Sequence, residues 1–63
     1  MLQLDANTLL SIINMKLRNN YKSLEDLGDD LNIDIELLKE KLLTNGYIYE
    51  ESYNQFISID AAK

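Results

Sequence analysis

The sequence predicts a small, mainly α-helical domain with a C-terminal β-hairpin. Leu and Ile recur at helical spacing in three segments, and each segment is bracketed by residues that favour helix ends. The last two segments are separated by a short turn, which is typical of a helix-turn-helix unit. After Gly46 the chain changes to aromatic and β-branched runs around a polar loop, a pattern that indicates a hairpin. This order, a three-helix core followed by one short wing, predicts a winged-helix-like fold.

The length of 63 residues predicts one domain over residues 1–63. A chain this short buries only about 60% of its unfolded surface. Because the sequence has no Cys and no His, neither a disulfide nor a zinc site can stabilise it, and Leu and Ile packing must do so. We expect a lead at 1–4, helices at 5–20, 23–32 and 34–45, a hairpin at 47–59 and a tail at 60–63.

The first predicted helix, residues 5–20, is amphipathic. Either Asp5 or Asn7 can cap its beginning, because both side chains accept hydrogen bonds from free backbone N–H groups. Lys16 and Arg18 near its end suit the negative pole of the helix. The apolar stripe consists of Leu9, Leu10, Ile13 and Leu17, and Ile12 and Met15 widen it, which predicts burial on more than one side.

The second and third predicted helices, 23–32 and 34–45, carry clear boundary signals. Ser23 with Asp26 is close to a capping box. Asn32 tolerates the left-handed conformation that ends a helix, and Asp34 can cap the next one. Gly28 lets the two helices approach closely. The apolar positions are Leu24, Leu27 and Leu31 in the second helix and Ile35, Leu38 and Leu42 in the third.

The hairpin is predicted from two β-prone runs, residues 47–49 and 55–59, around a polar loop at 50–54. Gly46 before it is the usual residue just after a helix end. Because an isolated hairpin is not stable in water, this one must pack against the helices. We expect the tail at 60–63 to be loose.

The charge of the chain is −5, from six basic and eleven acidic residues. Residues 1–22 carry three basic and one acidic residue, a sum of +2, and residues 23–63 carry three basic and ten acidic residues, a sum of −7. Such polarity suits contact between the first helix of one molecule and the acidic face of another, or a match within one molecule. The net charge opposes nonspecific nucleic-acid binding.

We expect a cytoplasmic protein, because the sequence shows neither a targeting segment nor a membrane-spanning run. Enzymatic chemistry and cofactor binding are not expected either. The chain has no His, no Cys and no Gly-rich phosphate loop, so its serines have no usual base.

One segment partly matches a calcium loop. Asp30, Asn32 and Asp34 have the spacing of the first three ligands of an EF-hand. The sixth position is Ile35 instead of the required Gly, and the twelfth is Lys41 instead of a bidentate Glu. The sequence therefore predicts no metal site.

Three runs carry a resemblance to a known family: LLSIINMKLRNNY, SLEDLGDDLNID and LLKEKLLTNGYIYEESYNQF. They resemble a family of short bacterial proteins described only as a domain of unknown function, over about residues 9–57. The resemblance implies the helical fold and a bacterial cytoplasm, and it transfers no catalytic residue. Its most specific parts are Lys16-Leu17-Arg18, Ser23-Leu24 with Leu27 and Asp30-Leu31, Gly46-Tyr47 with Tyr49, and Asn54-Gln55-Phe56.

The expected function is protein–protein interaction or self-association by a non-enzymatic module. The third helix has more Leu than one stripe can bury, since Leu37 and Leu43 lie off the apolar face. Tyr47, Tyr49 and Tyr53 cluster on and beside the hairpin, and Tyr is enriched at protein interfaces. The alternative, that a very small domain uses these side chains in its own core, stays open. The interface candidates are Leu37, Leu43, Tyr49 and Tyr53.

The alternative function is nucleic-acid binding, because the second helix of a helix-turn-helix can enter the major groove. Glu50 and Glu51 at the predicted wing tip would then face phosphates unfavourably. The candidate contacts are Lys39 and Lys41 in the third helix, and Lys16, Arg18 and Lys22 on phosphates.

Overall fold

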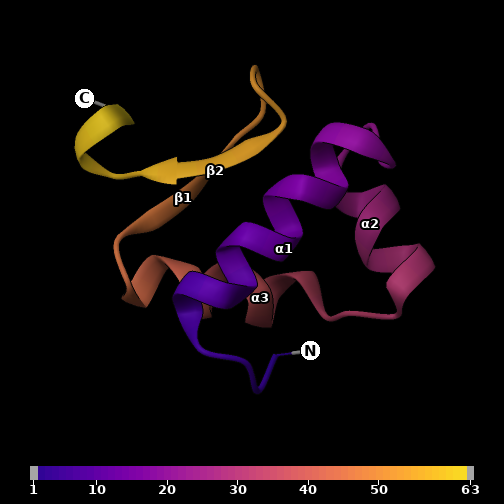
Figure 1. The fold of residues 1–63 in the computed structure, drawn as a ribbon, viewed down its shortest axis with the longest axis horizontal. Helices are drawn as coiled ribbons and strands as arrows, with labels where there is room; N and C mark the ends of the chain where they lie inside the picture. Colours follow the sequence, from indigo (N-terminus) through magenta and orange to yellow (C-terminus); the bar gives the residue numbers. More distant parts are fainter. Residues whose placement is uncertain (1, 63) are drawn as a thin grey trace.

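The computed structural model describes residues 2–62, which form three helices followed by an antiparallel hairpin (Figure 1). This order confirms the predicted helix-turn-helix core with a C-terminal wing. The helix α1 runs through the middle of the molecule, with the hairpin on one side and α2 on the other. The elements are α1 (Ala6–Asn19), α2 (Leu24–Leu31), α3 (Ile35–Thr44), β1 (Tyr47–Glu50), β2 (Gln55–Ser58) and a 3-10 turn, η1 (Asp60–Ala62).

The helix ends follow the predicted local signals. Asp5, the first of the two predicted cap candidates, accepts hydrogen bonds from backbone N–H groups in the first turn of α1. Ser23 and Asp34 do the same for α2 and α3. Asn32 ends α2 in the left-handed conformation, with φ of 56°. The beginning of each helix is therefore set by a side chain within its own segment.

The core consists of leucine and isoleucine side chains from all three helices, closed by one aromatic ring from the hairpin. Gly28 explains why α2 and α3 lie so close together. A Cβ atom at this position would lie 2.5 Å from both Cγ1 and Cδ1 of Ile35. Among residues 2–61, the buried apolar side chains are Leu9, Ile13, Leu17, Leu24, Leu27, Leu38, Leu42 and Phe56.

Expectations for α1 and for the C-terminal tail differ from the structure. Met15 does not extend the buried stripe of α1, because it lies about 200° around the helix from Ile13 and remains 51% exposed. Residues 60–62 form η1 instead of a loose tail, and the Ala61 N–H donates to Ser58 Oγ over 3.2 Å. Lys63, the last residue of the predicted tail, lies outside the described residues.

The hairpin pairs Tyr47 with Ser58 at one end and Glu50 with Gln55 at the other. Glu50 therefore belongs to β1, and the loop holds four residues, 51–54, not the five predicted. The Ile59 N–H continues the pairing by donating to the Gly46 carbonyl oxygen over 2.8 Å.

Side-chain amides attach the hairpin to α1, as the instability of an isolated hairpin required. The Asn14 amide accepts from the Phe56 N–H over 2.7 Å and donates to the Phe56 carbonyl oxygen over 2.9 Å. Gln55 Nε2 donates to the Asn14 carbonyl oxygen, and Asn54 Nδ2 donates to the carbonyl oxygens of Leu17 and Tyr21. Thus the segment Asn54-Gln55-Phe56, one of the most specific parts of the family resemblance, fixes the position of the hairpin.

Candidate functional site

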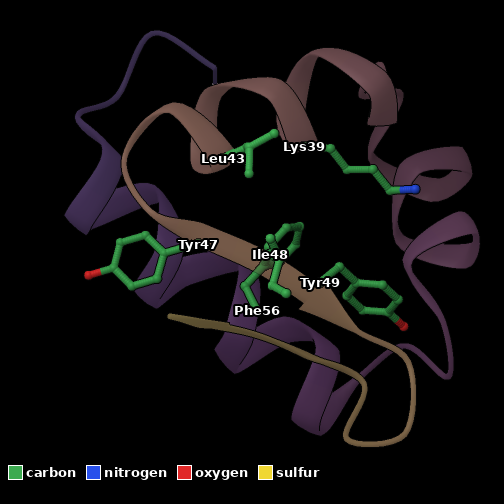
Figure 2. Close-up of a pocket in the computed structure, with 6 residues that line it drawn as sticks. All are labelled: Lys39, Leu43, Tyr47, Ile48, Tyr49 and Phe56. Carbon is green, nitrogen blue, oxygen red and sulfur yellow. The ribbon is translucent and has the colours of Figure 1, made fainter. Parts of the chain in front are cut away.

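A groove of about 240 Å³ lies between α3 and β1 (Figure 2). We call it the α3–β1 groove. Side chains from α3 and from β1 lie on opposite sides of it, with an aromatic ring from β2 between them. Its lining residues are Lys39 and Leu43 from α3, Tyr47, Ile48 and Tyr49 from β1, and Phe56 from β2.

The local fold places β1 beside α3. Asn45 ends the helix, and its N–H donates to the Leu42 carbonyl oxygen. Gly46 then adopts φ of 88°, a left-handed value that favours glycine and turns the chain back along the helix. Lys39 and Leu43 are four residues apart, so they lie on one face of α3 above the returning strand.

The floor of the groove is apolar and its upper wall is exposed. Phe56 belongs to the core and is 3% exposed. The Tyr49 ring packs against it, with ring centroids 5.5 Å apart and planes tilted by 56°. Leu43 above them is 53% exposed. The groove thus offers a contacting molecule an apolar surface continuous with the core.

Acidic side chains adjoin the groove at its Tyr49 end. Two neighbouring hollows, both of which reach Tyr49, are lined by Glu25, Glu50 and Glu51, which we call the acidic rim. Lys22 lines one of these hollows and Lys39 the other.

The pKa of the Tyr49 phenol reflects these surroundings. Burial raises the pKa of its phenol, and the charges of Glu25 and Glu51 raise it further, against a lowering effect of the Leu24 backbone. The phenol therefore stays neutral at physiological pH, and its O–H donates to Asn54 Oδ1.

The outer edge of β1 also borders the groove. The N–H and C=O of Phe56 point toward Asn14 and so away from β1. In an antiparallel pair, two directly opposed residues either both direct their N–H and C=O groups toward the partner strand or both direct them away from it. Tyr49 is opposite Phe56, and Tyr47 is two residues further, so the N–H and C=O of both tyrosines point outward from β2. Within residues 2–62, the sheet has two strands, and β2 is the one neighbour of β1.

The structure brings together two of the four predicted interface residues. Leu43 and Tyr49 both line the α3–β1 groove. Leu37 is 52% exposed but borders a separate shallow hollow with Lys41 and Thr44. Tyr53 lies in the hairpin loop and is 69% exposed.

The predicted nucleic-acid contacts have different neighbours. Lys39 borders the groove, Lys41 the hollow beside Leu37, and Lys22 a hollow that also contains the acidic rim. Lys16 and Arg18 lie in the last turn of α1.

Three residues of the groove, Tyr47, Ile48 and Phe56, are not among the predicted interface candidates, although Tyr47 belongs to the tyrosine cluster that suggested an interface. Their membership depends on how β1 lies against α3, and this follows from the Gly46 turn. A further signal in the sequence was that all three lie in a segment that carries the family resemblance.

The partial calcium-loop match has other structural uses. Asp30 accepts a hydrogen bond from the Tyr21 hydroxyl, Asn32 ends α2, and Asp34 caps α3. In the described part of the chain, no group of three or more His, Cys, Asp or Glu residues is placed to hold a metal ion. No helix among those same residues has the length and apolar character needed to cross a membrane.

Comparison with known protein families identifies a match over most of the chain. A family model described as a domain of unknown function, DUF4250, matches residues 3–56, which include the three helices, β1 and the residues that attach β2 to α1. Neither the curated proteins nor the solved structures gave a significant match.

Proposed function

The chain belongs to the DUF4250 family of domains of unknown function, and from this premise we propose that it is a protein-binding module that acts through the α3–β1 groove. The module binds a second protein or another copy of itself, in the bacterial cytoplasm, without catalysing a reaction. The observation that carries the proposal is the half-exposed Leu43 above the apolar floor formed by Phe56 and Tyr49.

The groove has the composition expected of an interface centre. Aromatic residues are enriched at such centres, and charged residues are depleted. Three of the six lining side chains are aromatic, two are aliphatic and Lys39 alone is charged. Burying the exposed half of Leu43 stabilises a complex by about 1 kcal/mol.

A binding role fits these side chains better than catalysis does. The groove offers two phenols and one ammonium group, and the sequence contains neither His nor Cys. A nucleophile with an adjacent general base, the usual requirement of covalent catalysis, is not among the lining residues.

Leu43→Ala and Leu37→Ala provide a matched test, because both leucines lie in α3 and are equally exposed. Both variants should fold like the parent chain by circular dichroism. We expect Leu43→Ala to weaken association about fivefold, as the loss of about 1 kcal/mol predicts, and Leu37→Ala to leave it unchanged. Sedimentation velocity measures self-association. Binding to other proteins is measured by affinity capture with the parent chain and with each variant. We expect proteins that the parent chain and Leu37→Ala retain to be lost with Leu43→Ala. Equal behaviour of the two variants would contradict the proposal.

A second candidate is nucleic-acid binding, favoured by the helix-turn-helix with a wing. In this role Lys39 and Lys41 of α3 contact the duplex. Glu36 and Glu40 on the same helix oppose it. Fluorescence anisotropy with labelled duplex DNA and RNA at two salt concentrations tests this candidate, because phosphate contacts give an affinity that falls steeply with salt. Absence of binding at low salt would remove it.

A further inference from the structure

We propose that the α3–β1 groove accepts an extended segment of a partner protein, with alternating apolar and basic side chains, which adds to β1 as a new strand. This inference rests on the proposed protein-binding function and names the conformation and chemistry of the partner.

The first argument is the hydrogen-bonding edge of β1. The N–H and C=O groups of Tyr47 and Tyr49 point away from β2 and toward the groove side of the sheet. Extended peptides bind such an edge through main-chain hydrogen bonds, while alternate side chains enter pockets beside it. On the opposite edge, Asn14 already occupies the corresponding groups of Phe56. The edge of β1 is therefore where a strand can be added.

The second argument is the size and lining of the groove. Pockets for small molecules usually have volumes of about 300–1,000 Å³. The α3–β1 groove, at about 240 Å³, is smaller, so it suits one or two side chains of a peptide. In an added strand, every second side chain points to the same face. Those on the groove face meet Leu43 and Phe56 and must be apolar.

The third argument is charge. The acidic rim of Glu25, Glu50 and Glu51 lies at the Tyr49 end of the groove, where it outnumbers Lys22 and Lys39 of the same two hollows. A lysine or arginine of the added segment is attracted there, and a carboxylate is repelled. The net charge of −5 also makes a second copy of this chain a poorer occupant than a basic segment, since two copies repel each other.

The experiment is an NMR titration of the ¹⁵N-labelled full chain with three synthetic peptides. The first alternates valine and lysine, and the second alternates valine and glutamate. The third repeats the first sequence with N-methyl groups on every second amide, which removes its main-chain donors on the pairing edge.

We expect the valine–lysine peptide to shift the amide resonances of Tyr47 and Tyr49 saturably and to slow their hydrogen exchange. The glutamate and N-methylated peptides should bind about tenfold more weakly, since one loses the charge match and the other the main-chain bonds. Equal binding of the N-methylated peptide would overturn strand addition, and equal binding of the glutamate peptide would overturn the basic specificity. Protection of both amides in the concentrated chain alone, with a dimer in sedimentation, would assign the edge to a second copy and overturn the proposal.

Two variants separate the roles of the acidic residues. The double substitution Glu25→Gln with Glu51→Gln should weaken the valine–lysine peptide about fivefold at low salt, with a smaller effect at high salt. Glu40→Gln, an acidic position of α3 outside the groove, is the matched control and should change nothing. If no peptide binds the β1 edge while Leu43→Ala still weakens association, the inference fails and the proposed function stands.

Discussion

Asn14 determines where the hairpin lies. The side-chain amide of Asn14 forms hydrogen bonds with both the N–H and the C=O of Phe56. The backbone carbonyl oxygen of Asn14 accepts a hydrogen bond from the Gln55 side chain. An amide is suited to this position because it carries a donor and an acceptor side by side. Neither a carboxylate nor an aliphatic side chain can make both bonds.

We therefore predict that Asn14→Ala destabilises the domain by about 1–3 kcal/mol, the cost of leaving part-buried backbone groups without partners. Asn14→Asp keeps the acceptor for the Phe56 N–H and loses the donor, so its effect should be intermediate. Urea denaturation measures both. Asn19→Ala, at an exposed position in the last turn of α1, is the control and should change stability by less than about 0.5 kcal/mol. A loss for Asn14→Ala no larger than that of the control would disprove the role.

At the scale of single elements, the helices were predictable because their ends are encoded locally. Asp5, Ser23 and Asp34 lie within three residues of the N–H groups that they accept from. The attachment of the hairpin was not predictable in this way. Asn14 and Phe56 are 42 residues apart, and no local sequence pattern indicates that they meet.

The same reasoning explains what was predicted of the candidate site. Leu43 was identified because it lies off the apolar stripe of α3, which is a property of one helix. Tyr47, Ile48 and Phe56 join it through the arrangement of two elements around the Gly46 turn. Met15 was wrongly included in the buried stripe because the sequence does not show how narrow the contact between α1 and its neighbours is.

The cap of α1 predicts a dependence of stability on pH. The pKa of Asp5 lies below its ordinary value of 3.8, chiefly because the Thr8 hydroxyl and then the Thr8 N–H donate to the carboxylate. Desolvation opposes this shift, and the Asn7 N–H and the charge of Lys41 add smaller lowering effects. A carboxyl with a lowered pKa in the folded state stabilises that state above its unfolded pKa. This contribution is lost as the pH falls through the folded pKa.

We expect Asp5→Asn to be slightly less stable than the parent chain at pH 7, because Asn also caps helices but lacks the charge. The difference should shrink between pH 4 and pH 2, where the parent carboxyl becomes protonated. Urea denaturation across this range tests the prediction. A difference that stays constant with pH would show that the charge of Asp5 does not contribute.

For the whole molecule, stability depends on a core of few side chains. Domains have about 0.05–0.15 kcal/mol of stability per residue, so a chain of 63 residues has about 3–9 kcal/mol. Removing one buried leucine costs about 2–5 kcal/mol. A single core substitution can therefore remove most of the stability of this domain.

The neighbours Leu37 and Leu38 test this directly. Leu38 is 0% exposed and Leu37 is 52% exposed, although both occupy the middle of α3. We predict that Leu38→Ala lowers the free energy of unfolding by about 2–5 kcal/mol and leaves a measurable unfolded fraction at 37 °C. Leu37→Ala should remain within about 0.5 kcal/mol of the parent. Similar thermal midpoints for the two variants would contradict the core assignment.

The closure of one side of the sheet by Asn14 sets a limit on stoichiometry. A sheet with two unpaired edge strands can pair edge to edge with a molecule on each side and so grow into filaments. Within residues 2–62, Asn14 occupies the outward backbone groups of Phe56 on β2, whereas those of Tyr47 and Tyr49 on β1 face away from the pair, so a partner strand is expected to join at β1. Complexes of this protein are expected to remain finite, with one guest for each chain, even at high concentration.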